Sequence, residues 1–298
     1  MYPRAFRYYR AESLSDAVEI LSDLGEDARL LAGGQSLIPL MKLRLASPGH
    51  LVDLGFVPGL SYIHEEKGRL VFGPMTRHVE IENSALVQKV PILHDCAAGI
   101  ADVQVRNRGT LGGSLAEADP TGDWAPVLLT LDTEVQCESP VGERKLPLPD
   151  FTTDAFTTVL APDELISEIT VRLPEGRSGG AYMAVKRCAP VYASASAAVQ
   201  LTMNDDSNCR EARIALGAVG LTAIRAAEAE AQLRGRAVDA KSIAAAAEAA
   251  MHAADPQSDM RGSADYKRTL VRTLVSRALD AALRRSRGQS VEVGHLYA

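Results

Sequence analysis

The sequence predicts an α+β protein of two domains, and two observations support this prediction. Up to about residue 176, short strand patterns alternate with amphipathic helix patterns and glycine-rich turns. After a predicted linker rich in proline and glycine at 174–180, three strand patterns follow one another and precede alanine-rich helix patterns. We therefore predict a first domain at residues 1–176 and a second at 177–298.

The elements of the first domain begin with a helix at residues 13–24. Ser13 can cap its start, its apolar residues recur on one face, and Gly25 can end it. The remaining elements follow from short apolar runs and turn residues. They are strands at 28–32, 50–54 and 134–137, a hairpin at 62–72, and helices at 37–43, 79–87, 91–101 and 124–131.

The elements of the second domain fall into two blocks. The strand block has three runs rich in apolar residues, and the helix block is rich in alanine and carries apolar positions at helical spacing. The predicted strands are 182–187, 193–203 and 212–219, and the predicted helices are 223–234, 240–254 and 264–284.

Composition excludes several classes of function. The net charge of -6 and the lack of a basic run argue against a nucleic-acid partner. We predict no transmembrane segment and no secretory signal, which indicates a cytoplasmic location, either free or membrane-associated through a complex. The four cysteines are too far apart to predict a metal or iron–sulfur site, and no dinucleotide-binding, P-loop, serine-elbow or zinc-protease motif occurs.

Two glycine pairs are the strongest candidates for a ligand site. Residues 32–36, the first glycine turn, lie between a predicted strand and a predicted helix. Residues 110–114, the second glycine turn, carry two hydroxyl residues around a glycine pair. Adjacent glycines let backbone N–H groups approach a phosphate, although the same pattern is typical of a tight turn with a helix cap. Two such turns in one domain favour a ligand with two linked phosphates.

The acidic and aromatic residues after the second turn leave alternatives open. Asp119 and Asp123 are compatible with a turn, a metal or acid–base pair, or hydrogen bonds to sugar hydroxyls. We favour the turn for Asp119 and hydroxyl binding for Asp123, and we expect Trp124 in the core. The histidines show no ligand spacing and are predicted to be surface or partly buried residues: His50, His64, His78, His94, His252 and His295.

The two glycine turns and the Asp-Pro-Thr-Gly-Asp segment at 119–123 resemble the FAD-binding medium subunits of molybdenum hydroxylases. The resemblance is strongest to the medium subunits of aerobic carbon monoxide dehydrogenases and extends to the flavin domains of xanthine dehydrogenases. It covers nearly the whole chain. It implies a two-subdomain FAD-binding domain of the vanillyl-alcohol-oxidase (PCMH) type, followed by a C-terminal domain of a small antiparallel sheet plus helices.

The resemblance also implies a set of FAD-binding residues. Both glycine turns are expected to enclose the pyrophosphate, and Lys186 and Tyr192 are expected near the flavin ring. Gln35 stands where the family commonly has histidine, and Pro190 and Val191 stand where it usually has an acidic residue or glycine. The implied residues are Ala32, Gly33, Gly34, Gln35, Ser36, Ile100, Thr110, Gly112, Gly113, Ser114, Asp123, Ile166, Lys186 and Tyr192.

The function implied by the resemblance is electron transfer through non-covalently bound FAD. Electrons would come from the [2Fe–2S] clusters of a small partner subunit and ultimately from the molybdenum cofactor of a large one, in a dimer of heterotrimers. No catalytic residue and no metal ligand are expected on this chain. Two alternatives remain open: a self-sufficient, non-covalent flavin oxidase or dehydrogenase of the same fold, and a non-catalytic scaffold.

Overall fold

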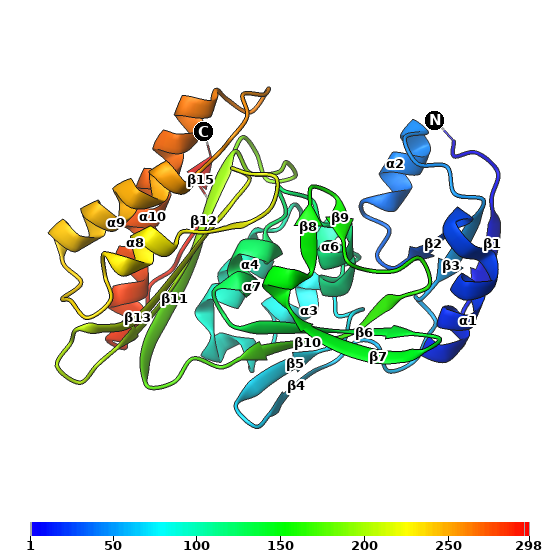
Figure 1. The fold of residues 1–298 in the computed structure, drawn as a ribbon, viewed down its shortest axis with the longest axis horizontal. Helices are drawn as coiled ribbons and strands as arrows, with labels where there is room; N and C mark the ends of the chain where they lie inside the picture. The colour runs from blue at the N-terminus through cyan, green and yellow to red at the C-terminus, as the bar shows by residue number, and fades with distance from the viewer. Residues whose placement is uncertain (1, 295, 298) are drawn as a thin grey trace.

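The computed structural model describes residues 2–294 and 296–297 and confirms the mixed α+β class. Figure 1 shows a small N-terminal lobe in blue, a central sheet with its helices, and a C-terminal sheet covered by the last helices. Each of these three parts has its own buried apolar cluster, and the central cluster also includes residues of the C-terminal sheet.

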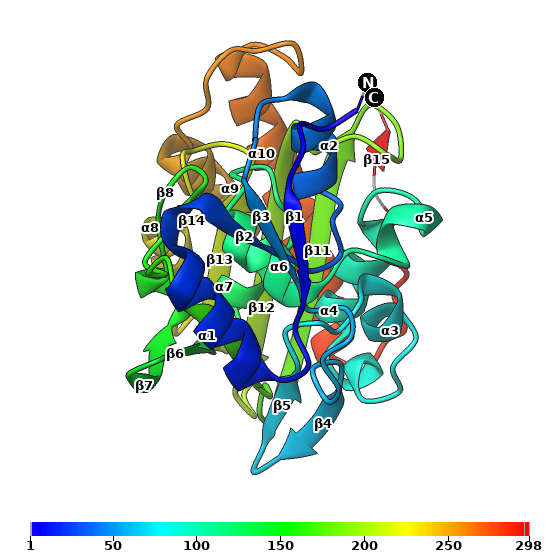
Figure 2. The same ribbon diagram turned by 90° about the vertical axis from the view of Figure 1, so that its right-hand side faces the viewer.

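The N-terminal lobe is a parallel three-stranded sheet in the order β1-β3-β2, with α1 packed on it (Figure 2). The predicted cap of α1 is confirmed, because the Ser13 hydroxyl accepts a hydrogen bond from the Asp16 N–H at 3.0 Å. The lobe's elements are β1 (Arg7–Arg10), α1 (Leu14–Leu24), η1 (Gly25–Asp27), β2 (Ala28–Leu31), α2 (Leu37–Leu43) and β3 (His50–Asp53).

The central part is an antiparallel sheet in the order β4-β5-β10-β6-β7. The helix predicted at 79–87 is confirmed only over its first residues, because α3 ends at Glu82 and the Asn83 side-chain amide donates to the Val79 carbonyl. The strands are β4 (Ile63–Glu66), β5 (Arg69–Phe72), β6 (Thr133–Ser139), β7 (Gly142–Pro147), β8 (Thr152–Asp154), β9 (Thr157–Thr158) and β10 (Leu165–Arg172). The helices are α3 (His78–Glu82), η2 (Val87–Lys89), α4 (Pro91–Gly99), α5 (Val103–Arg106), α6 (Leu111–Glu117), α7 (Trp124–Leu129) and η3 (Leu148–Asp150).

The C-terminal part is a sheet in the order β14-β13-β12-β11-β15, antiparallel except for the parallel pair β11 and β15. Two predictions are wrong here. Gly179 and Gly180 of the expected linker lie inside β11, and the helix expected at 223–234 begins with an edge strand instead. The elements are β11 (Arg177–Lys186), β12 (Ala195–Met203), β13 (Cys209–Gly217), β14 (Ile224–Arg225), α8 (Ala227–Ala231), α9 (Ala240–Ala253), α10 (Ala264–Ser286) and β15 (Leu296–Tyr297).

The C-terminal sheet is covered on both faces. Helix α10 packs on one face, while α4 and α7 of the central part pack on the other (Figure 1). Close packing depends on small residues, since a Cβ on Gly179 would lie 2.2 Å from the Ala282 carbonyl oxygen of α10. Arg285 of α10 also binds Asp95 of α4 through two buried contacts of 2.5 and 2.9 Å. This packing holds the first half of β11 between α10 and the central part.

None of the helices among the described residues is both long and apolar enough to cross a bilayer.

Candidate functional site

A cleft of about 860 Å³ opens where the three parts of the molecule meet. This volume falls in the range of small-molecule and cofactor sites, about 300–1,000 Å³. Every residue predicted for the cofactor site lines it. The N-terminal lobe contributes the first glycine turn, the central part contributes the second, and the C-terminal part contributes Lys186 and Tyr192.

The first glycine turn presents backbone donors to the cleft. Gly34 has a φ of 71°, in the left-handed region, so the chain reverses direction sharply before α2. Within the described part of the chain, the N–H groups of residues 33–36 donate to no other residue. Gln35 hydrogen-bonds only weakly inside the turn, from Nε2 to the Gly33 carbonyl at 3.4 Å. The turn can therefore supply several N–H groups to an anion.

The second glycine turn works differently from the first, contrary to the expectation that both offer the same backbone chemistry. It forms the first turn of α6, and the N–H groups of residues 111–114 are used within the protein. Gly112 donates to the Pro74 carbonyl at 2.9 Å, and Gly113 donates to the Thr110 hydroxyl at 3.1 Å. The hydroxyl groups of Thr110 and Ser114 remain able to donate to a ligand in the cleft.

The two glycine turns converge. A Cβ placed on Gly33 would lie 2.1 Å from the Arg108 carbonyl oxygen and 2.9 Å from the Gly109 Cα, just before the second turn. A Cβ on Gly113 would lie 3.6 Å from the Ala32 Cβ. The turns are therefore in direct contact, and they face one cleft together.

A buried ion pair forms the floor of the cleft. Lys186 Nζ lies 3.1 Å from one Asp123 carboxylate oxygen and donates to the Gly99 carbonyl at 2.9 Å. The Tyr182 hydroxyl donates to the other Asp123 oxygen at 2.6 Å. Lys186 and Asp123 are only 1% and 7% exposed, so each charge depends on the other for stabilisation. The Asp123 carboxylate also helps raise the pKa of Tyr182, after the larger effect of burial.

The remaining walls are apolar and aromatic. Ile100, at the end of α4, and Ile166, in β10, contribute buried aliphatic surface. Tyr192 reaches the cleft from the loop after β11, with the Arg261 guanidinium 5.8 Å from its ring centre. Burial raises the pKa of Tyr192, the Asp119 carboxylate raises it further, and a hydrogen bond with Ser36 acts in the opposite direction. Tyr192 thus links the C-terminal part to the first glycine turn.

Two predictions near the start of α7, the turn at Asp119 and the burial of Trp124, are confirmed. Asp119 accepts hydrogen bonds from the Thr121 N–H and hydroxyl at 2.8 and 2.7 Å, which closes a turn. Trp124 is 1% exposed and belongs to the central core, which confirms its predicted place there.

Sequence reasoning missed His78. The prediction of a surface or partly buried residue is wrong for it, because His78 is buried and lines the cleft. Burial lowers its pKa from 6.5 to about 4, the Arg106 guanidinium contributes to the lowering, and the Asp123 carboxylate opposes it. The sequence Thr-Arg-His at 76–78 contains no pattern that predicts a buried histidine; the burial follows only from the fold. His295 lies outside the described residues.

The depressed pKa of His78 predicts a pH-dependent stability. The unfolded chain binds a proton more readily than the folded one, so this contribution is fully present above pH 6.5 and is lost as the pH falls toward about 4. One pKa unit corresponds to about 1.4 kcal/mol, so the loss should approach about 3 kcal/mol. Urea unfolding at several pH values should therefore show a steeper acid loss for the wild type than for His78→Gln. An equal loss of unfolding free energy with falling pH in the two proteins would contradict a lowered pKa of His78.

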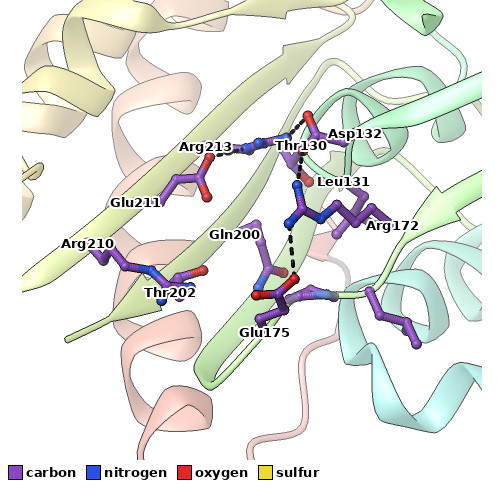
Figure 3. Close-up of a pocket in the computed structure, with 12 residues that line it drawn as sticks. Thr130, Leu131, Asp132, Arg172, Glu175, Gln200, Thr202, Arg210, Glu211 and Arg213 are labelled. Carbon is purple, nitrogen blue, oxygen red and sulfur yellow. Dashed lines mark hydrogen bonds and ion pairs between the residues drawn. The ribbon is translucent and has the colours of Figure 1, made fainter. Parts of the chain in front are cut away.

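A second, smaller cavity lies between the central and C-terminal sheets and has a volume of about 70 Å³. Figure 3 shows Arg213 and Arg172 both turned toward Asp132, and Arg172 also lies 3.0 Å from Glu175. Because these arginines are already paired with carboxylates, we assign the cavity to the contact between the two parts and not to a ligand.

Within residues 2–294 and 296–297, no group of three or more histidine, cysteine or acidic side chains is placed to hold a metal ion. The four cysteines are free thiols, of which Cys188 is exposed and the others are buried.

The sequence matches two family models. Residues 4–175 match the family described as FAD binding domain in molybdopterin dehydrogenase, and residues 180–282 match the CO dehydrogenase flavoprotein C-terminal domain. The chain belongs to the FAD-binding medium subunits of molybdenum hydroxylases. This confirms the resemblance inferred from the glycine turns.

The chain aligns with individual members of this medium-subunit family over nearly their full length. The chain is 42% identical to the 6-hydroxypseudooxynicotine dehydrogenase complex subunit alpha of Paenarthrobacter nicotinovorans, over 99% of this chain and 100% of that one. It is 39% identical to the carbon monoxide dehydrogenase medium chain of Hydrogenophaga pseudoflava, over 95% and 98%. A solved structure of carbon monoxide dehydrogenase from the same organism superposes with a TM-score of 0.93 at 40% identity, over 96% and 99%. This chain and the solved structure therefore share the medium-subunit fold over nearly their whole length.

Proposed function

We propose that this chain binds FAD non-covalently in the cleft, with the two linked phosphates held between the glycine turns. The observation that carries the proposal is the convergence of these turns, since Gly33 abuts the backbone at Arg108 and both turns face one cavity. A dinucleotide needs donors for a diphosphate next to a long, partly apolar groove. The cleft combines both properties.

The lining residues would bind different parts of FAD, according to their chemistry. The first turn would supply N–H donors to the diphosphate, and Thr110 and Ser114 would supply hydroxyl donors. Ile100, Ile166 and Tyr192 would enclose the flat flavin and the chain attached to it. Asp123 would accept hydrogen bonds from hydroxyls of that chain beside its contacts with Tyr182 and Lys186.

The paired charge of Lys186 refines the expectation that this residue lies beside the flavin. Its ammonium group already contacts Asp123 and the Gly99 carbonyl. We therefore assign Lys186 to ordering the floor of the cleft beneath the cofactor, and not to supplying an unpaired positive charge.

In function, the chain would be the electron-transfer subunit of a molybdenum hydroxylase. When bound, flavin supplies a group that exchanges electrons singly or in pairs. The chain's own residues bind the flavin, orient it and shield its apolar faces. Electrons would arrive from a small [2Fe–2S] partner subunit, fed by a large molybdenum-cofactor subunit, and leave to an external acceptor, in a dimer of heterotrimers.

The substrate of the complex is assigned to the large partner subunit. Relatives at 42% and 39% identity carry names that refer to 6-hydroxypseudooxynicotine and to carbon monoxide. Because such different substrates accompany similar medium chains, we infer that this chain carries the shared electron-transfer step.

The visible spectrum of the purified chain tests the proposal. We expect flavin absorption, and we expect acid precipitation to release all of it as FAD into the supernatant. Co-purification with the natural partner chains should add iron–sulfur absorption, and mass spectrometry should identify a small and a large subunit.

Other outcomes point to the two alternatives. A colourless chain that leaves added FAD unbound would favour a scaffold. Flavin that binds and reacts with an organic substrate in the absence of any partner would favour a self-sufficient oxidase.

A further inference from the structure

His78 is a buried polar side chain that the proposed roles do not use. It begins α3, its side chain is 5% exposed, and its main-chain N–H donates to the Gly109 carbonyl at 3.1 Å. A Cβ placed on Gly109 would lie 2.8 Å from His78 Nε2, so the imidazole lies against the backbone that leads into the second glycine turn. Both residues line the cleft.

One hydrogen bond fixes the tautomer of this imidazole. Trp124 donates from Nε1 to His78 Nδ1 at 3.2 Å. An indole N–H can only donate, so Nδ1 must be the acceptor, and the ring proton of the neutral imidazole must be on Nε2. Trp124 is itself locked in the core at 1% exposure, which holds the ring in this orientation.

The Nε2–H donor has no protein partner among the described residues. Among the described residues, only His50 Nδ1 is a side-chain N or O atom that is both fully shielded from solvent and unpaired. His78 Nε2 therefore keeps some exposure, and His78 lines the cleft. A donor that is fixed in direction, largely buried and unpaired is costly unless an acceptor or water meets it.

We propose that His78 is a further FAD-binding residue, which donates a hydrogen bond from Nε2 to an acceptor atom of the bound flavin nucleotide. The inference rests on the proposed function, since it takes FAD as the ligand of the cleft. A neutral donor keeps this bond constant around neutral pH, because the pKa of His78 lies near 4. The groups whose charges act on His78 are Asp123 and Arg106.

Two conservative variants separate ligand binding from a purely structural role. The amide of His78→Asn takes the place of Nδ1, so it can still accept from Trp124 but cannot reach the cleft. The longer side chain of His78→Gln places an amide donor near the Nε2 position and loses the acceptor for Trp124. If His78 donates to the ligand, His78→Asn should bind FAD more weakly than His78→Gln. If His78 only holds Trp124 in place, the order of the two affinities should be reversed.

The measurement is a titration of the flavin-free chain with FAD, followed by quenching of flavin fluorescence near neutral pH. We expect about tenfold weaker binding for His78→Asn, the effect of about one lost hydrogen bond, and a change of less than about twofold for His78→Gln. Circular dichroism of each flavin-free variant controls for folding.

Three results would overturn the inference. Unchanged affinity in His78→Asn, or equal weakening in both variants, rejects the donor role and leaves the proposed function standing. A wild-type chain that does not quench FAD fluorescence rejects both together.

A second measurement needs no variant. With ¹⁵N-labelled histidine, long-range ¹H–¹⁵N spectra of the wild-type chain should show His78 protonated on Nε2, and FAD should shift that proton resonance. A proton on Nδ1, or a resonance that FAD leaves unchanged, would reject the inference even if the variants failed to fold.

Discussion

Replacing Gly33 with alanine is expected to weaken FAD binding by up to about a hundredfold, because overpacking costs about 1–3 kcal/mol and each 1.4 kcal/mol is tenfold. The added methyl group would lie 2.1 Å from the Arg108 carbonyl oxygen. Neither partner can yield easily, since the obstructing atoms are backbone atoms beside the second glycine turn. The two turns would be pushed apart, and their donors would no longer meet one diphosphate. Fluorescence titration of the flavin-free variant measures the loss.

Gly294 provides the matched control for this substitution. A Cβ there would meet nothing within 4 Å, and the backbone is outside the left-handed region. Gly294→Ala should therefore bind FAD like the wild type. Equal affinities for Gly33→Ala and the wild type would show that contact between the turns is not needed for binding.

Replacing Asp123 with alanine is expected to cost about 4 kcal/mol of stability, since removal of one partner of a buried ion pair costs about 3–5 kcal/mol. The variant leaves the Lys186 ammonium 1% exposed with only the Gly99 carbonyl as acceptor, and it removes one hydrogen-bond partner of the Tyr182 hydroxyl. Urea unfolding of the flavin-free chain measures the change without any contribution from the ligand.

Two further variants test that explanation. Asp123→Asn combined with Lys186→Met removes both charges and should recover much of the lost stability, because no unpaired charge remains buried. Glu175→Ala removes an exposed partner of Arg172 and should leave the unfolding midpoint unchanged. An Asp123→Ala midpoint equal to that of Glu175→Ala would rule out a stabilising role for the buried pair.

Local signals in the sequence predicted many elements well. Ser13 and Gly25 bracket α1 as expected, and α2 has the predicted bounds. The central strand β10 was missed because a bulge between Ile166 and Glu168 interrupts its alternation. The predicted helix at 223–234 fails at its start, since pairing of Ile224 and Arg225 with β13 overrides their helical pattern.

The lining of the cleft was predictable where the signal lies in one short segment of the sequence. Each glycine turn carries its own signal, so their residues could be named, and their common cleft follows from the pairing of two similar turns. The different use of backbone N–H groups in the two turns was not predictable, because it depends on Pro74 and Thr76 from another segment. The same holds for the ion pair of Asp123 and Lys186, which are 63 residues apart in the chain.

The position of the cleft at the junction of three parts has a thermodynamic consequence. A ligand held by both the first glycine turn and Tyr192 acts as a non-covalent crosslink between the ends of the molecule. By linkage, the free energy that such a ligand gains on binding is also free energy that resists separation of the lobes. If FAD occupies the cleft as proposed, its loss would therefore weaken the association of the lobes that line the cleft.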